Sequence, residues 1–121
     1  MVIKIRQEQI EAFIEARVND FVRELCGRLR IEMAEECRNI ADLKAFVSDG
    51  LARARHYQVY SEAAVETFVR IQLSLGAGFD TDPRYPWAAE ILRSDTAVDA
   101  VKMWLLSRSA ERLRVEARPE A

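Results

Sequence analysis

The stretch that decides the fold is LSLGAGFDTDPRYPWAAEIL, which spans residues 73–92. It holds two of the four glycines of the chain and two of its three prolines. Gly76 or Gly78 can close a helix in a left-handed conformation without a Cβ penalty, whereas proline cannot continue a helix interior. We therefore predict a corner here, in which one helix ends near Leu75 and a short helix begins at Pro86.

The polar and aromatic residues of this corner allow two interpretations. Short polar side chains such as Asp80 and Asp82 bond the local backbone and favour turns and helix caps. The rings of Phe79, Tyr85 and Trp87 are large enough to pack beneath the corner, with Trp87 as an anchor in the core. Alternatively, these rings and the two aspartates form a surface that binds a partner.

Apolar residues on both sides of the corner recur at spacings of three and four, which is the pattern of helices with one buried face. Five helices are expected, at about 6–36, 40–56, 62–75, 86–92 and 96–115. No segment alternates with a period of two for long enough to build a sheet. The predicted fold is an all-α bundle in which residues 1–121 form a single domain, with a frayed tail at 116–121.

Local signals refine this bundle. Asn39, with Asp42 three residues later, is the expected start of the second helix, and Ser61 is the expected N-cap of the third. Gly50 lies on the apolar stripe of the second helix, where its missing side chain would let another helix approach. Residues 57–60 are too short for a helix and are rich in aromatic and β-branched side chains, so we expect an extended link.

The first and last helices carry more apolar residues than the bundle itself requires. The helix at 6–30 is about 37 Å long at 1.5 Å per residue, which is longer than three short helices can cover. The expected inner face of the last helix consists of Val98, Val101, Leu105 and Leu106. Met103 and Trp104 widen its apolar arc, and such residues are enriched where interfaces are buried.

This surplus of apolar surface predicts a protein partner. The residues expected to contact it are Asp80, Asp82, Tyr85, Met103 and Trp104. Two alternatives stay open at this point. The two long helices could simply sandwich the rest of the bundle, or the same surface could mediate a homodimer, since most oligomers of soluble proteins are homodimers.

Charge and composition argue against several classes of protein. The 121 residues include 18 basic and 20 acidic ones, a net charge of −2, so no broad positive field favours nucleic acid. No apolar run approaches the roughly 18 residues that mark a membrane span. The apolar start at residues 1–6 is too short and too charged for a signal peptide, so we expect a cytoplasmic protein.

No catalytic, metal-binding or cofactor-binding arrangement is expected. His56 is the only histidine, and it has no nearby carboxylate to orient it. Cys26 and Cys37 are eleven residues apart, which is not the spacing of a zinc ligand pair, and they are too few for a disulfide framework. Asp80 and Asp82 resemble the opening of a calcium loop, but the glycine and the terminal glutamate of that loop are missing. Nothing beyond proximity supports an acid–base pair formed by these two aspartates.

Several segments together resemble a known group of proteins. These are GLARARHY at 50–57, the Ser61-Glu62 start of the helix at 64–75, LGAGFD at 75–80 and DPRYPWAAEIL at 82–92. They resemble small helical bacterial proteins that are encoded beside type VI secretion spike-tip (PAAR-type) proteins and toxin effectors. The resemblance covers most of the chain and is most specific at the corner.

The resemblance implies a non-enzymatic role in protein binding. Some proteins of this group are similar in size to co-adaptors, which assist an adaptor-chaperone in loading a toxin onto the spike. We therefore expect a co-adaptor or chaperone whose partner is an adaptor-chaperone or a toxin effector. The alternative is an immunity protein that neutralises a cognate toxin. The resemblance implies no catalytic residue for this chain.

Overall fold

The computed structural model describes residues 6–94 and 97–117, and every regular element within them is helical. The prediction of an all-α bundle is therefore confirmed. The elements in chain order are α1 (Gln7–Glu32), α2 (Ala34–Arg38), α3 (Leu43–His56), α4 (Glu62–Leu75), the 3₁₀ helix η1 (Phe79–Thr81), α5 (Pro86–Leu92) and α6 (Asp99–Ala117). Most of the predicted frayed tail, residues 118–121, lies outside the described residues.

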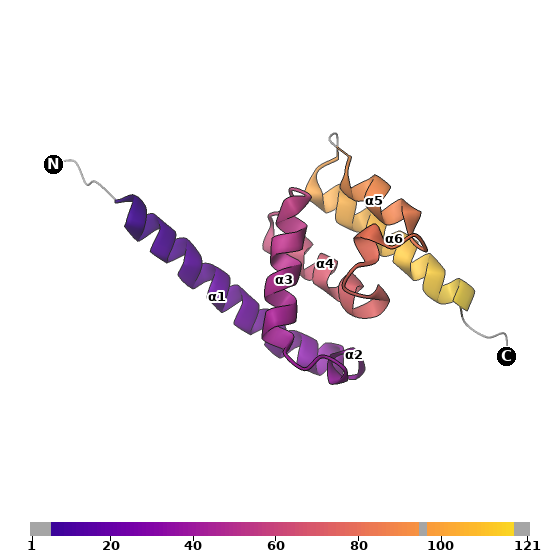
Figure 1. Ribbon diagram of the computed structural model, residues 1–121, viewed down its shortest axis with the longest axis horizontal. Helices are drawn as coiled ribbons and strands as arrows, with labels where there is room; N and C mark the ends of the chain where they lie inside the picture. The colour runs from indigo at the N-terminus through magenta and orange to yellow at the C-terminus, as the bar shows by residue number, and fades with distance from the viewer. Residues whose placement is uncertain (1–5, 95–96, 118–121) are drawn as a thin grey trace.

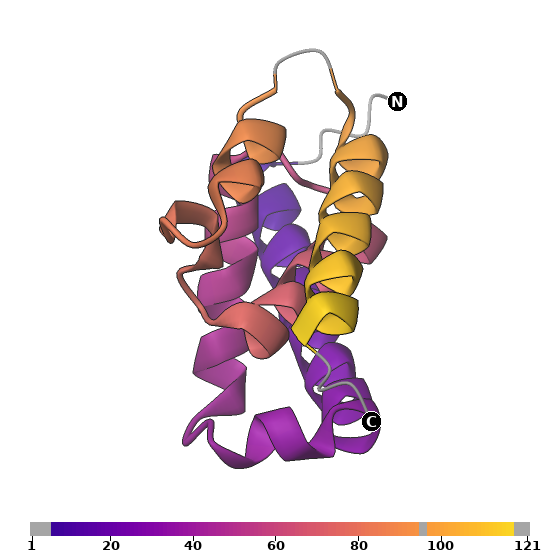
Figure 2. The same cartoon turned by 90° about the vertical axis from the view of Figure 1, so that its right-hand side faces the viewer.

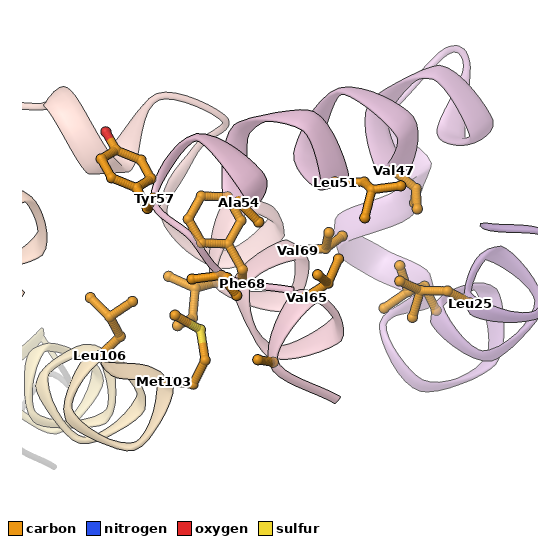
Figure 3. Close-up of a cluster of buried hydrophobic side chains, with 14 of the residues drawn as sticks. Leu25, Val47, Leu51, Ala54, Tyr57, Val65, Phe68, Val69, Met103 and Leu106 are labelled. Carbon is orange, nitrogen blue, oxygen red and sulfur yellow. The ribbon is translucent and has the colours of Figure 1, made fainter. Parts of the chain in front are cut away.

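Helix α4 lies at the centre of the fold. It contacts α1 and α3 as well as α6, and α5 packs beside α6 (Figures 1 and 2). Figure 3 shows the resulting core, to which α4 contributes Val65, Phe68 and Val69. Leu25 of α1 lies on one side of these residues and Leu106 of α6 on the other. A single hydrophobic core therefore joins the first helix to the last.

Only the C-terminal half of α1 takes part in this core. Its buried side chains are Phe21, Val22, Leu25, Cys26 and Leu29. The N-terminal half of the helix projects away from the other helices, as Figure 1 shows in indigo. The expectation that α1 is longer than its neighbours can cover is met, and its consequence for exposed side chains is described below.

Helix limits agree with the predictions where a cap or a proline defines them. The Ser61 Oγ accepts the Ala64 N–H at 3.2 Å, and α4 starts where this cap predicts. Pro86 occupies the first position of α5, which also has its predicted limits. Asn39, by contrast, does not start α3. The Asp42 carboxylate accepts the Ala45 N–H at 3.0 Å instead, so α3 begins at Leu43.

The single helix predicted at 6–36 is in fact two. Helix α1 ends at Met33, where φ is −130° and ψ is 47°, and the short α2 follows. This break changes the direction of the chain, and partly buried Cys37 and Ile40 pack against the core beyond it. Helical spacing alone did not show this break because the apolar residues after it keep a compatible period.

The link at 57–60 is a turn rather than a simple extended segment. Gln58 has a φ of 62°, an uncommon value for a residue other than glycine. The turn leaves both Tyr57 and Val59 buried on either side of it. The Lys102 ammonium of α6 donates a hydrogen bond to the Tyr57 carbonyl at 3.2 Å, which ties the link to the last helix.

Gly50 allows the close approach of α3 and α4 that its position on the apolar stripe predicts. A Cβ atom at this position would lie 2.9 Å from Cγ2 of Val69 and 2.5 Å from Oε1 of Gln72. Carbon atoms do not approach this closely without displacement of a neighbour. The missing side chain is therefore a packing requirement of this helix pair.

The last helix is rotated relative to its predicted orientation. Val98, Val101 and Leu105 were expected to face inward, but all three are exposed, whereas Met103 and Leu106 are buried. Two stripes at helical spacing compete on this helix. The buried stripe continues through Ser107 and Ala110, which border a groove with α4 and α1. Their small side chains let α6 approach α4 closely.

Candidate functional site

One candidate binding surface lies on the outer side of α6. Its exposed apolar side chains, called here the α6 surface, are Val98, Val101, Trp104 and Leu105. Trp104 is the largest of them and is 57% exposed. The guanidinium of Arg108 lies 4.9 Å from the centre of the Trp104 ring, a cation–π contact that orients the ring without covering it from solvent.

A shallow groove of about 310 Å³ borders this surface between α4 and α6. Ala64 and Thr67 of α4 line one side, and Ala100 and Trp104 of α6 line the other. Small residues on α4 leave room above the helix, and the indole forms one wall. The groove can therefore accept an apolar side chain of another molecule next to Trp104.

A second apolar surface lies on the projecting half of α1, residues 7–20, which we call the arm. Ile10 is 46% exposed, Phe13 is 78% exposed and Ile14 is 53% exposed. They lie at helical spacing, so they form one stripe along the arm. Soluble monomers rarely leave a contiguous apolar stripe of this kind exposed, and such a stripe marks an interaction site.

Where the arm leaves the bundle, its apolar stripe forms one wall of a groove of about 260 Å³, called here the arm groove. Phe21 of α1, Leu51 of α3 and Val65 of α4 line its deeper part. Arg55 and Tyr60 lie at its edge, and Tyr60 is itself exposed. The interior of the groove is apolar, and its rim carries the Arg17–Glu62 ion pair and the guanidinium of Arg55.

Three ion pairs among the described residues hold α1 to α4, namely Arg17 with Glu62, Arg28 with Glu66 and Arg70 with Glu32. Arg17 forms a bidentate pair with Glu62, with its Nε atom 2.9 Å from the carboxylate. Further along, the Glu66 carboxylate accepts hydrogen bonds from Arg28 and Arg70. Burial opposes ionisation of Glu66, but these two arginines outweigh it and lower the pKa of the carboxyl. The base of the arm is thereby held at a defined angle to the bundle.

Of the five residues predicted to contact a partner, Asp80 and Met103 are buried. Met103 is 4% exposed and packs in the core beside Phe68, so its expected place on an accessible flank of the helix is wrong. Asp80 is 1% exposed and accepts hydrogen bonds from Arg53 Nε at 2.6 Å and from the Tyr57 hydroxyl at 2.6 Å. Its carboxylate holds the corner to α3.

This buried network alters the ionisation of its members. Burial, followed by the hydrogen bond to Asp80, raises the pKa of Tyr57 to about 12. The hydrogen bond to Asp80 likewise raises the pKa of Arg53 above its ordinary value. Both pKa shifts favour the protonated side chains of Tyr57 and Arg53, which donate hydrogen bonds to the Asp80 carboxylate. Asp80 thus forms an ion pair with Arg53 and accepts a further hydrogen bond from the neutral hydroxyl of Tyr57.

The other three predicted residues are accessible. Asp82 accepts hydrogen bonds from the backbone and guanidinium of Arg84, which lower the pKa of its carboxyl. Tyr85 is half-buried between the Arg84 guanidinium, 5.3 Å from its ring centre, and Trp87, whose ring centre lies 5.8 Å away. Trp87 is also only half-buried against the core, and it is not the deeply buried anchor that was expected. Asp82, Tyr85 and Trp104 are thus the predicted contacts that a partner can reach.

The sequence did not single out Ile10, Phe13 and Ile14 as exposed, because they continue the stripe that is buried further along α1. The signal that indicates surplus surface is the length of the helix compared with its neighbours. For α6, the small residues Ser107 and Ala110 could have indicated which face is buried. They lie at helical spacing from Met103 and Leu106, the buried apolar residues of this helix.

Two classes of site were also sought in the described part of the chain. No group of three or more histidine, cysteine, aspartate or glutamate side chains there is arranged to hold a metal ion. None of the helices in residues 6–94 and 97–117 combines the length and the apolar character needed to cross a lipid bilayer. Comparison with known proteins found no matching family model, no matching curated protein and no matching solved structure.

Proposed function

We propose that this chain is a non-enzymatic accessory protein that binds another protein through the α6 surface. The observation that carries the proposal is the exposed apolar α6 surface, with Trp104 as its largest side chain, together with the groove beside it. Covering such side chains removes apolar area from water, which stabilises a complex by about 25 cal/mol per Å². Tryptophan is also among the residues whose truncation weakens interfaces most.

The class of partner in this proposal comes from the sequence resemblance. Under this proposal, the chain is a co-adaptor or chaperone that helps an adaptor-chaperone load a toxin effector of a type VI secretion system. The α6 surface fits this role because Val98, Val101 and Leu105 are spaced to receive an apolar helix, with Trp104 as the largest contact. Asp82 and Tyr85 at the corner are proposed as a second, more polar contact.

The direct test is co-expression of the chain with the products of neighbouring genes, followed by affinity purification. Trp104→Asp is expected to abolish co-purification of the adaptor or effector, because it places a charge in the centre of the buried interface. Its fold should be retained, since the side chain is largely exposed. Ile31→Asp is the matched control: Ile31 is 83% exposed on a different helix, and its variant should bind like the parent.

The outcome separates three possibilities. Loss of binding in Trp104→Asp, with an unchanged melting temperature, supports the α6 surface. Retained binding in that variant and loss in Asp82→Arg would move the interface to the corner. Retained binding in both would contradict the proposal for these surfaces. A chain that protects cells from a co-expressed toxin, without promoting its loading, would instead be an immunity protein.

A further inference from the structure

We propose that two copies of this chain form a symmetric dimer in which the arm of each copy enters the arm groove of the other. The arm and the groove are features of the same molecule, and both expose apolar side chains. Both are separate from the α6 surface, so the dimer does not depend on the proposed function. It is also compatible with it, because the α6 surface stays accessible on a different helix.

The first argument is the match in shape and polarity. The arm presents Ile10, Phe13 and Ile14 along one side, and the groove is lined by buried apolar residues at the junction of α1, α3 and α4. Phe13 and Ile14 line one wall of the groove in their own copy, Ile10 lies outside it, and the space between the walls stays open. A second helix with the same stripe can contact both the arm and the lining.

The second argument is charge complementarity. Arg55 stands at the rim of the groove, and its guanidinium forms no ion pair with the side chains of the described residues. Glu11 lies on one flank of the arm's apolar stripe, and it belongs to no ion pair among those residues. An incoming arm therefore brings negative charge toward a positive rim, so the two parts of this chain are complementary in sign.

The third argument is symmetry. When two such arms lie antiparallel, with Phe13 and Ile14 near the two-fold axis, the start of each arm reaches the groove of the other copy. In the proposed dimer, Glu11 of each arm pairs with Arg55 of the other copy. Each copy supplies one arm and one groove, which is the arrangement of an isologous dimer, the commonest oligomer of soluble proteins. Within each copy, the pair of Arg17 and Glu62 holds the base of the arm to α4.

The first experiment measures the mass of the purified full chain by light scattering over a range of concentrations. The expected mass is twice that of the 13.9 kDa chain. Phe13→Asp is expected to give the mass of one chain with an unchanged helical dichroism spectrum, because the side chain is 78% exposed. Ile31→Asp lies on the same helix outside the arm and groove, so it should remain dimeric.

The second experiment exchanges the charges. Arg55→Glu alone, or Glu11→Arg alone, places like charges at both arm–groove contacts of a homodimer. Each variant should raise the dissociation constant by about tenfold or more. When the two variants are mixed in equal amounts, both contacts of the mixed dimer pair opposite charges. The mixture is therefore expected to form heterodimers, although each variant alone is monomeric.

Several results would overturn the proposal. One is a wild-type chain that is monomeric at its highest soluble concentration. Another is a Phe13→Asp chain that dimerises as strongly as wild type, and a third is a mixture of charge variants that stays monomeric. A monomeric wild-type chain that captures an adaptor or effector only when Phe13 is intact would assign the arm groove to that protein instead.

Discussion

At the scale of single residues, Tyr57 joins parts of the chain that are far apart in sequence. Its hydroxyl donates to Asp80 in η1, and its carbonyl accepts from Lys102 in α6. Its ring centre lies 6.5 Å from that of Phe68 in α4. The sequence predicted a turn role for Asp80 but not its burial, because its partner Arg53 lies 27 residues away and no local pattern connects them.

Ionisation of Tyr57 gives the first prediction, a loss of stability at high pH. The pKa of Tyr57 is about 12 in the folded chain, against an ordinary value of 10.0. Because the folded state favours the neutral hydroxyl, its contribution is fully present below pH 10 and disappears as the pH rises toward 12. Two pKa units correspond to about 3 kcal/mol of unfolding free energy.

Chemical unfolding of the wild-type chain and of Tyr57→Phe across this pH range measures the effect. Phe cannot ionise, so the wild type should lose about 2 kcal/mol more stability than the variant between pH 10 and 12, which is most of the full effect. Cysteines and lysines that also titrate at high pH are common to both proteins and cancel in the difference. Equal losses in the two proteins would show that the Tyr57 hydroxyl ionises as freely as in water.

At the scale of helices, the contact between α3 and α4 gives the second prediction, which compares two glycines in helices. Gly50→Ala should destabilise the fold by about 1–3 kcal/mol, since the new methyl group would overlap Val69 and Gln72. Gly27 has no atom within 4 Å of the place of a Cβ, so Gly27→Ala should stabilise α1 by up to about 1 kcal/mol. Thermal or chemical unfolding of both variants measures the difference. A stabilised Gly50→Ala variant would mean that the two helices can move apart at little cost.

Local signals explain why some helices could be predicted closely and others could not. The limits of α4 and α5 follow from Ser61 and Pro86, which act through atoms within one turn. The orientation of α6 depends on which of two apolar stripes meets α4, and that choice is made by neighbours absent from the local sequence. The break at Met33 has the same origin, because the packing of α2 against the core decides it.

The candidate surfaces were predicted less well than the fold for a related reason. Exposure is a property of the whole arrangement, whereas periodicity reports only that a stripe exists. Trp104 was identified because it widens an apolar arc, and the structure leaves it exposed. Phe13 continues the stripe that is buried further along α1, yet it is exposed because it lies on the part of the helix that projects from the bundle.

At the scale of the whole molecule, α1 begins outside the core and ends inside it. Residues 21–32 supply the buried side chains that α1 contributes to the core, whereas residues 7–20 supply none. An isolated helix of this length is marginal in water. One continuous helix therefore consists of two parts that differ in the free energy needed to open their backbone hydrogen bonds.

This difference gives the last prediction, which concerns amide hydrogen exchange. In the Phe13→Asp monomer, amides of residues 11–20 should exchange through local fraying, many times faster than those of residues 25–32. In the wild-type dimer, the arm is covered by a second copy, and its amides should slow toward the rate set by dissociation. The exchange of the arm would then depend on protein concentration while that of Leu25 and Leu29 would not. The exchange rate of the arm amides would thus measure dimer formation, since only a second copy protects the arm from local fraying.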